Sequence, residues 1–247
     1  MSLFANMKHH EDISAPKDTL GGGNYIKETN IYPALIKMAY AFTSDAGAQG
    51  VAMEFLLQDG STYKEKFYVS KATGENYSEK DGKKFYMQGF VTVDEICALG
   101  TGQYLANQTT EDKLVEVYQY PEGKVEKEMP VLTDLINKKV LLAIQQVRKY
   151  KSEKQNGKWV ETWETQDINE ISKVFNTDKF TVAELMEEKE EPTFHDKWLE
   201  KNEGEFYDRT KNKKPKGATG TGPGTGTGSP KAGAPANSAP KTLFNRK

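Results

Sequence analysis

The chain has 247 residues, of which 36% are hydrophobic, with one cysteine, three histidines, 34 basic residues and 36 acidic residues. A single cysteine excludes a disulfide framework and a cysteine-based zinc site, and no apolar run approaches the roughly 18–20 residues of a membrane span. Residues 1–12 lack the apolar stretch of a signal peptide. We therefore expect a soluble, cytoplasmic protein with no membrane partner.

The N-terminal part of the chain is typical of an antiparallel meander. Alternating apolar and polar residues predict strands at 31–42, 51–58 and 62–71. On the first strand, one predicted face comprises Ala34, Ile36, Met38, Tyr40 and Phe42. The Asp59-Gly60 pair predicts a hairpin with a primed turn. The third strand should carry Tyr63, Phe67 and Val69 on one face and Lys64, Lys66 and Tyr68 on the other.

The following segments mix loop, helix and strand signals. A polar loop at 72–84 precedes a predicted helix over 92–100, with Thr92 as N-cap and Gly100 as C-cap. Further strands are expected at 114–120, 139–150 and 159–165, and Asn156-Gly157 predicts a primed turn between the last two. Capped helices are expected from Thr181 to Glu191 and onward to Glu203.

This element order predicts a mainly β fold. It lacks the βαβ alternation of a parallel sheet, and β-β-β-α-β-β is the order of the five-stranded antiparallel oligonucleotide/oligosaccharide-binding (OB) barrel. The expectation is thus an OB-like barrel with extra hairpin and loop insertions, a short helix after the third strand, and C-terminal acidic helices. Other small barrels and a β-sandwich fit the same order.

Charge and composition divide the chain into unlike segments. Residues 184–208 hold ten acidic residues and three lysines, whereas residues 209–247 hold nine basic residues and no acidic one. Residues 217–240 are almost entirely Gly, Ala, Thr, Ser and Pro, which is the composition of a flexible linker. We predict a mobile N-terminus at 1–20, an OB-like domain at 21–183, an acidic helical segment at 184–208, and a disordered basic arm at 209–247.

Signals for catalysis are weak. The chain has no P-loop motif, and the run at 21–23 of three glycines precedes a strand instead of a helix. The run at 9–12, His-His-Glu-Asp, reads as solvated charge, and no pair of carboxylates stands out as a Mg²⁺ site. The sequence therefore predicts a non-enzymatic protein without metal or cofactor. A metal-dependent nuclease is a remote alternative.

Aromatic residues interleave with basic ones on predicted strands and adjoining loops. Single-stranded nucleic acid is bound by basic grooves with aromatic rings on which bases stack, each stacked base contributing about 1–3 kcal/mol. Strand aromatics also serve as core or cross-strand partners, and strand lysines as edge protection. The predicted nucleic-acid-binding residues are Lys64, Lys66, Tyr68, Lys71, Lys83, Lys84, Phe85, Tyr86, Arg148, Lys149, Tyr150, Lys151, Lys158 and Trp159.

Residues 21–176 resemble the phage-encoded single-stranded DNA-binding proteins with an OB barrel. The resemblance lies in the opening Gly-Asn-Tyr-Ile-Lys-Glu-Thr-Asn-Ile-Tyr, in Gly-Val-Ala-Met-Glu-Phe at 50–55 with its Asp-Gly hairpin, in Lys-Asp-Gly-Lys at 80–83, and in the Met-Pro-Val-Leu approach at 129–132 to the last hairpin. It implies that the chain coats exposed single strands in phage DNA replication, recombination or repair, without catalysis and in the host bacterial cytoplasm.

The C-terminus departs from that family, whose members end in an acidic tail with an apolar tip. Here the acidic segment is internal, and the basic arm carries the apolar pair Leu243 and Phe244 close to its end, which we predict to bind a partner. Replication or recombination proteins are the expected partners of the arm or the acidic segment, and a homo-oligomer is compatible with the sequence. The alternative function is a protein-interaction adaptor, or a phage inhibitor of a host enzyme, acting through the acidic segment.

Overall fold

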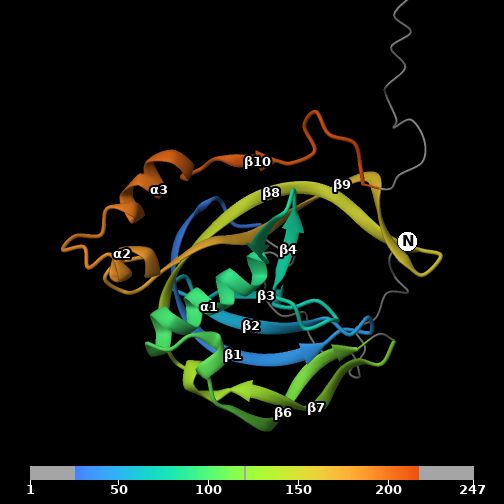
Figure 1. The fold of residues 1–247 in the computed structure, drawn as a ribbon, viewed down its shortest axis with the longest axis horizontal. Coiled ribbons are helices and arrows are strands. Elements are labelled where there is room, and N and C mark those ends of the chain that lie inside the picture. Colours follow the sequence, from blue (N-terminus) through green and yellow to red (C-terminus); the bar gives the residue numbers. More distant parts are fainter. Residues whose placement is uncertain (1–25, 120, 217–247) are drawn as a thin grey trace, which may run out of the picture. The chain divides into compact units, whose positions relative to one another are not determined.

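The structure is a computed structural model that describes residues 26–119 and 121–216 (Figure 1). The predicted mobile N-terminus, its histidine and glycine runs, and the arm beyond residue 216 with Leu243 and Phe244 lie outside the described residues. The chain divides into two compact units. Of the described residues, the first unit comprises 26–119, 121–147 and Ile168–Tyr207, and the second comprises Arg148–Asp167 and 208–216.

The described residues form mainly antiparallel β structure, which confirms the predicted class. One sheet contains β1 (Asn30–Thr43), β2 (Gln49–Leu57), β3 (Thr62–Tyr68), β6 (Thr110–Gln119), β7 (Gly123–Leu132), β8 (Lys139–Gln155), β9 (Lys158–Phe175) and β10 (Phe206–Asp208). A separate hairpin contains β4 (Tyr77–Lys80) and β5 (Lys83–Tyr86). The helices are α1 (Gln88–Thr101), α2 (Val182–Met186) and α3 (Phe194–Asn202), and the 3-10 turns are η1 (Leu105–Asn107) and η2 (Thr133–Leu135). None of the helices in the described ranges is both long and apolar enough to span a membrane.

The strands do not form a closed barrel in the described residues, so the predicted five-stranded OB-like barrel is not confirmed. The main path of the sheet runs β10-β8-β1-β2-β3, β9 pairs with β8, and the β6–β7 hairpin joins through β7 to β1 (Figure 1). Within the described chain, β3 pairs only with β2. The sequence pattern missed β7, whose charged residues alternate with few apolar ones because much of the β6–β7 hairpin is exposed.

The core of the first unit lies between the inner face of this sheet and helix α1. Ile36, Phe55 and Leu142 are fully buried on β1, β2 and β8. Helix α1 contributes Ile96 and Cys97 to the same cluster, as its apolar spacing predicts. Burial raises the pKa of the Cys97 thiol to about 12, with Asp94 adding to the effect, so the cysteine acts as a small apolar core residue.

A β-bulge on β1 changes which residues share a face. Ile36 pairs with Phe55 of β2, but the next pair joins Met38 to Glu54, so Lys37 is the extra residue. An extra residue reverses the alternation of the side chains beyond it. The prediction that Ile36 and Phe42 share a face is therefore wrong, because Phe42 follows the bulge and lies on the opposite side.

Helix α1 is longer than predicted at both ends. It begins at Gln88, and the Thr92 hydroxyl donates to the Gln88 carbonyl oxygen at 3.0 Å, so Thr92 is a buried interior residue and no N-cap. The C-cap is Gly102, whose φ of +78° is left-handed, instead of Gly100.

The hairpin turns differ from one another. Asp81 and Gly82 have φ values of +53° and +71°, and together they form a primed two-residue turn between β4 and β5. The predicted polar loop at 72–84 is thus partly a hairpin. The Asn156-Gly157 turn is confirmed, with φ values of +49° and +78°. At 58–61 the hairpin exists, but only Gly60 has positive φ, so the predicted primed turn is wrong there.

The acidic segment is organised around Glu184. Thr181 caps α2 in a capping box, as predicted: its hydroxyl accepts from the Glu184 N–H, and the Glu184 carboxylate accepts from the Thr181 N–H, both at 3.1 Å. The same carboxylate accepts the N–H groups of Thr193 and Phe194 at 2.9 and 2.8 Å. Glu184 thus joins the starts of α2 and α3, and α2 ends at Met186, short of the predicted Glu191.

Candidate nucleic-acid interface

One face of β3 exposes the basic and aromatic residues that the sequence predicted. Lys64, Lys66 and Tyr68 are exposed, whereas Phe67 on the other face is buried and Tyr63 is partly buried. The period-2 alternation of a strand accounts for this separation. Tyr68 leaves 47% of its surface open, so its ring is available for stacking.

The neighbouring strands extend this face into an aromatic platform that sequence reasoning missed. The Phe42 ring on β1 meets the Tyr68 ring edge-on, with 5.6 Å between centroids, and the Lys66 Nζ lies 5.7 Å from the Phe42 centroid. Gly50 of β2 pairs with both Phe42 and Tyr68 and lies between them. We call Phe42, Gly50, Lys66 and Tyr68 the β1–β3 platform.

Gly50 is required by this packing. A Cβ atom at this position would lie 2.3 Å from the Phe42 ring and 2.7 Å from the backbone oxygen of Phe67. The absence of a side chain therefore lets the Phe42 ring cross the strand. The glycine at 50 was a visible signal, but only the bulge at Lys37 turns Phe42 toward it.

Charge on the platform edge is partly compensated. The Lys64 ammonium lies 2.6 Å from the Glu54 carboxylate, next to Tyr40 on the outer face. Burial raises the pKa of Tyr40, while Lys64 lowers it and Glu54 raises it. A phosphate at Lys64 must therefore compete with Glu54, which reduces the contribution of this lysine.

The β4–β5 hairpin carries the second predicted cluster. Lys83, Lys84, Phe85 and Tyr86 are all exposed on β5. The Lys84 Nζ donates to the Tyr77 hydroxyl at 3.1 Å and lies 4.4 Å from the Tyr77 centroid.

Tyr86 and Lys71, two of the predicted binding residues in this region, contact other side chains of the protein. The Tyr86 ring lies 5.3 Å from the Phe90 ring at the start of α1. Lys71 pairs with Glu75 at 3.2 Å and lies 5.6 Å from the centroid of the Tyr77 ring. Lys71 is thus engaged in its own loop, whereas Phe85 and Tyr86 leave 55% and 66% of their surfaces exposed.

The remaining predicted residues belong to the second unit, on the outer parts of β8 and β9. These are Arg148, Lys149, Tyr150, Lys151, Lys158 and Trp159. Trp159 is largely exposed. The structure therefore divides the predicted site between the two units.

Several of these residues form contacts that stabilise the hairpin of β8 and β9. Arg148 forms a bidentate pair with Asp167 at 2.7 and 2.9 Å. Lys151 pairs with Glu164 at 2.8 Å. The Tyr150 hydroxyl donates to the Lys213 carbonyl oxygen at 2.8 Å, which fixes the start of the basic arm on β8.

Comparison with models of known protein families gives no match, and comparison with curated protein sequences gives none either.

Proposed function

We propose that the chain binds single-stranded DNA without sequence specificity and without catalysis, and protects exposed strands during phage DNA replication or recombination. The observation that carries the proposal is the β1–β3 platform, where exposed Tyr68 contacts Phe42 and the Lys66 ammonium lies beside the Phe42 ring. Bases stack on aromatic faces whatever their sequence, and lysines neutralise the phosphates between them. The platform offers both kinds of group on one sheet face.

The strand path supports an open form of the OB barrel. The order β9-β8-β1-β2-β3, with α1 following β3, fits the five-stranded, partly open barrel. A side chain connects the two ends of this path: the Glu65 carboxylate on β3 accepts the Ile171 N–H of β9 at 3.1 Å, and it also accepts the Tyr63 hydroxyl at 2.6 Å. OB folds bind oligonucleotides on the face of their second and third strands, which is where Lys66 and Tyr68 lie.

A fluorescence titration of the full chain with labelled oligo-dT tests this function. Affinity should fall steeply between 50 and 200 mM salt, because bound lysines release counterions from the DNA. Tyr68→Ala should weaken binding roughly tenfold, through the loss of one stacked base. Lys197→Ala, at an exposed position on α3, should leave affinity unchanged. Absent or salt-insensitive binding would exclude the proposal.

The acidic segment supports a second candidate function, that of a protein-interaction adaptor or inhibitor. Leu185 and Met186 on α2 are exposed, and the Met186 sulfur lies 3.7 Å from the Tyr104 hydroxyl. Exposed glutamates follow directly at 187, 188, 190 and 191. An apolar surface bordered by carboxylates suits a basic, amphipathic peptide. A pull-down with the chain, after nuclease has removed nucleic acid from the sample, tests this function. Capture of one host protein that Met186→Asp abolishes, together with no affinity of the chain for oligo-dT, would favour it.

A further inference from the structure

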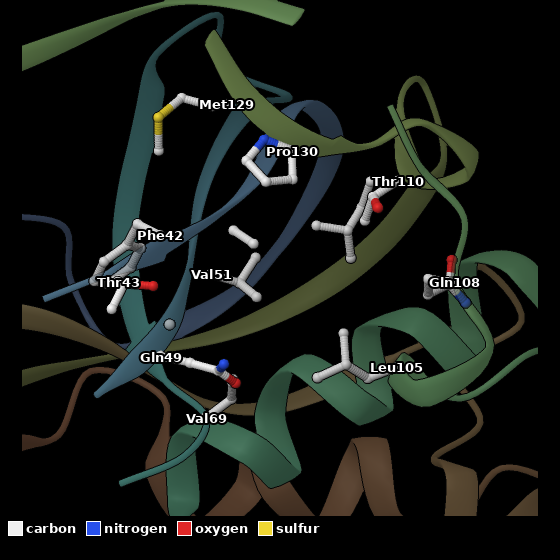
Figure 2. A pocket seen from close by; sticks show the side chains of 13 residues that line it. Phe42, Thr43, Gln49, Val51, Val69, Leu105, Gln108, Thr110, Met129 and Pro130 are labelled. Carbon is white, nitrogen blue, oxygen red and sulfur yellow. The ribbon is translucent and has the colours of Figure 1, made fainter. Parts of the chain in front are cut away.

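A cavity of about 560 Å³ opens beside the β1–β3 platform, between the end of β1, the start of β2, the start of β6 and the end of β7. Figure 2 shows Phe42 and Met129 on one side of it, with Gln108 and Thr110 opposite. Val51 projects into the space between them (Figure 2). The side chains therefore enclose a space of the size that takes a small planar group.

The lining of this cavity is uncharged. Its apolar walls include Val51, Val69, Leu105 and Met129. Its polar members are amides and hydroxyls, and none of its lining residues is acidic or basic. Phosphate would find no cation here, whereas a planar, uncharged heterocycle finds apolar walls together with a few donors and acceptors.

The cavity is continuous with the platform. Phe42 and Gly50 belong to both, and Lys66 lies beside the same Phe42 ring. Phe42 is thus the boundary between the two: its ring contacts Tyr68 and Lys66 on the outer face, and it also lines the cavity with Val51 and Val69 of the inner face. The charged and uncharged surfaces correspond to the two parts of a nucleotide, the phosphate and the base.

Gln108 adds a polar group of fixed orientation to the cavity wall. Its Nε2 donates to the Thr101 hydroxyl and to the Gln103 carbonyl oxygen, both at 2.8 Å. These two acceptors determine which end of the amide carries oxygen. The buried Oε1 has no hydrogen-bond partner among the described residues. Because this oxygen is buried, a ligand in the cavity reaches it only if the Gln108 side chain moves, and Gln108 contributes its shape to the wall.

We propose that this cavity receives one unpaired nucleobase of the bound strand, while the phosphates on either side lie along the lysines of β3. The inference rests on the proposed single-stranded DNA binding and adds to it a site that holds a nucleobase, whatever its identity. It requires that removal of the base, with the phosphate chain left intact, abolishes occupation of the cavity.

Methionine methyl NMR on the full chain tests this site, because Met129 lines the cavity and Met186 lies on α2 outside it. Oligo-dT should shift the Met129 methyl resonance and leave that of Met186 in place. An oligonucleotide of the same length built from abasic residues should leave Met129 unshifted. An equal Met129 shift with the abasic strand would overturn the proposal.

Blocking the cavity provides an independent measurement. Thr110→Trp, at an exposed lining position, should lower oligo-dT affinity roughly tenfold, the cost of one lost base contact. Thr177→Trp, at an exposed position after β9, is the matched control and should bind as the unmodified chain does.

The outcomes separate this proposal from the function on which it rests. Suppose that oligo-dT binds in a salt-sensitive way, but the Met129 methyl resonance does not shift and Thr110→Trp leaves the affinity unchanged. This result would overturn the base site and leave the proposed function standing. Failure of every oligonucleotide to bind would overturn both. A Met129 shift produced only by a synthetic peptide of residues 241–247 would assign the cavity to an apolar side chain and overturn the base site.

Discussion

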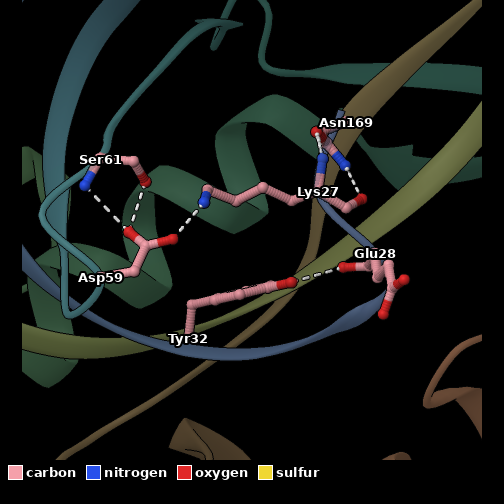
Figure 3. Close-up of polar contacts among 6 residues, drawn as sticks. All are labelled: Lys27, Glu28, Tyr32, Asp59, Ser61 and Asn169. Atoms are coloured by element: carbon pink, nitrogen blue, oxygen red, sulfur yellow. Dashed lines mark hydrogen bonds and ion pairs between the residues drawn. The ribbon is translucent and has the colours of Figure 1, made fainter. Parts of the chain in front are cut away.

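Asn169 on β9 holds the backbone of Lys27 with both ends of its side-chain amide. Its Oδ1 accepts the Lys27 N–H and its Nδ2 donates to the Lys27 carbonyl oxygen, each at 2.8 Å (Figure 3). The Lys27 ammonium reaches Asp59 in the β2–β3 turn at 2.6 Å. One side chain thus replaces a pair of ladder hydrogen bonds and fixes the segment before β1 onto β9, 142 residues away in sequence.

Asn169→Ala should detach this segment. It removes both hydrogen bonds to the backbone of buried Lys27, so the free energy of unfolding should fall by about 1–3 kcal/mol. Urea denaturation measures the loss, and hydrogen exchange should show faster exchange of the Lys27 amide. Asn107→Ala, at an exposed position in η1, should change stability by less than about 0.5 kcal/mol. Equal effects of the two substitutions would contradict the role of Asn169.

The pKa of Asp59 reports the same contact. The hydrogen bond from Lys27 lowers it to about 2, with help from the hydroxyl and N–H of Ser61. Lys27→Met should raise this pKa toward its ordinary value near 4, since the Ser61 contacts alone remain. An NMR titration of the Asp59 carboxyl carbon measures both values. Because the folded pKa is depressed, the stabilisation is present above about pH 4 and is lost as the pH falls toward 2. An unchanged Asp59 pKa in the variant would disprove the ion pair.

The contacts of the Glu184 carboxylate should make the stability of the acidic segment depend on pH. Burial raises its pKa, but the backbone N–H groups of Thr181, Phe194 and Thr193 outweigh burial and lower it to about 2. The charged form therefore stabilises the fold above about pH 4.5, and this contribution disappears as the pH falls through 2. Glu184→Gln should destabilise the chain by roughly 2 kcal/mol at pH 7, because charge-assisted hydrogen bonds are lost.

Thermal unfolding of both proteins between pH 7 and pH 2.5 measures this effect. The difference between the unmodified chain and Glu184→Gln should shrink as the pH falls. Glu187→Gln, at an exposed position one residue after α2, should show neither the loss nor the pH trend. A difference that is constant over this pH range would mean that shape, and not charge, is what Glu184 contributes.

Two glycines should respond to alanine in opposite directions. Gly50→Ala forces the Phe42 ring and the β3 backbone away, so it should destabilise the chain by about 1–3 kcal/mol and weaken oligo-dT binding. At Gly100 in α1, a Cβ meets its nearest atom, on Leu135, at an ordinary 3.5 Å. Gly100→Ala should therefore stabilise the helix by about 0.5–1 kcal/mol and leave binding unchanged. Calorimetry checks the signs, and two changes of the same sign would refute this account of the packing.

The sequence alone determined the local structure. Alternation turns Lys64, Lys66 and Tyr68 outward on β3, because a strand has a period of two residues. Asn156-Gly157 forms a primed turn, because that turn needs two residues that tolerate positive φ. Thr181 and Glu184 form their capping box within four residues.

Only the tertiary structure decided which of these local features meet. The bulge at Lys37 turns Phe42 toward Gly50 and Tyr68, and no local pattern marks where a strand takes an extra residue, because the pairing with β2 selects it. The β6–β7 hairpin and η1 complete the cavity with residues 60 or more positions from Phe42 along the chain. Periodicity describes the chain within a few residues, whereas the platform and the cavity arise from contacts between distant strands, whose register depends on how the whole core packs.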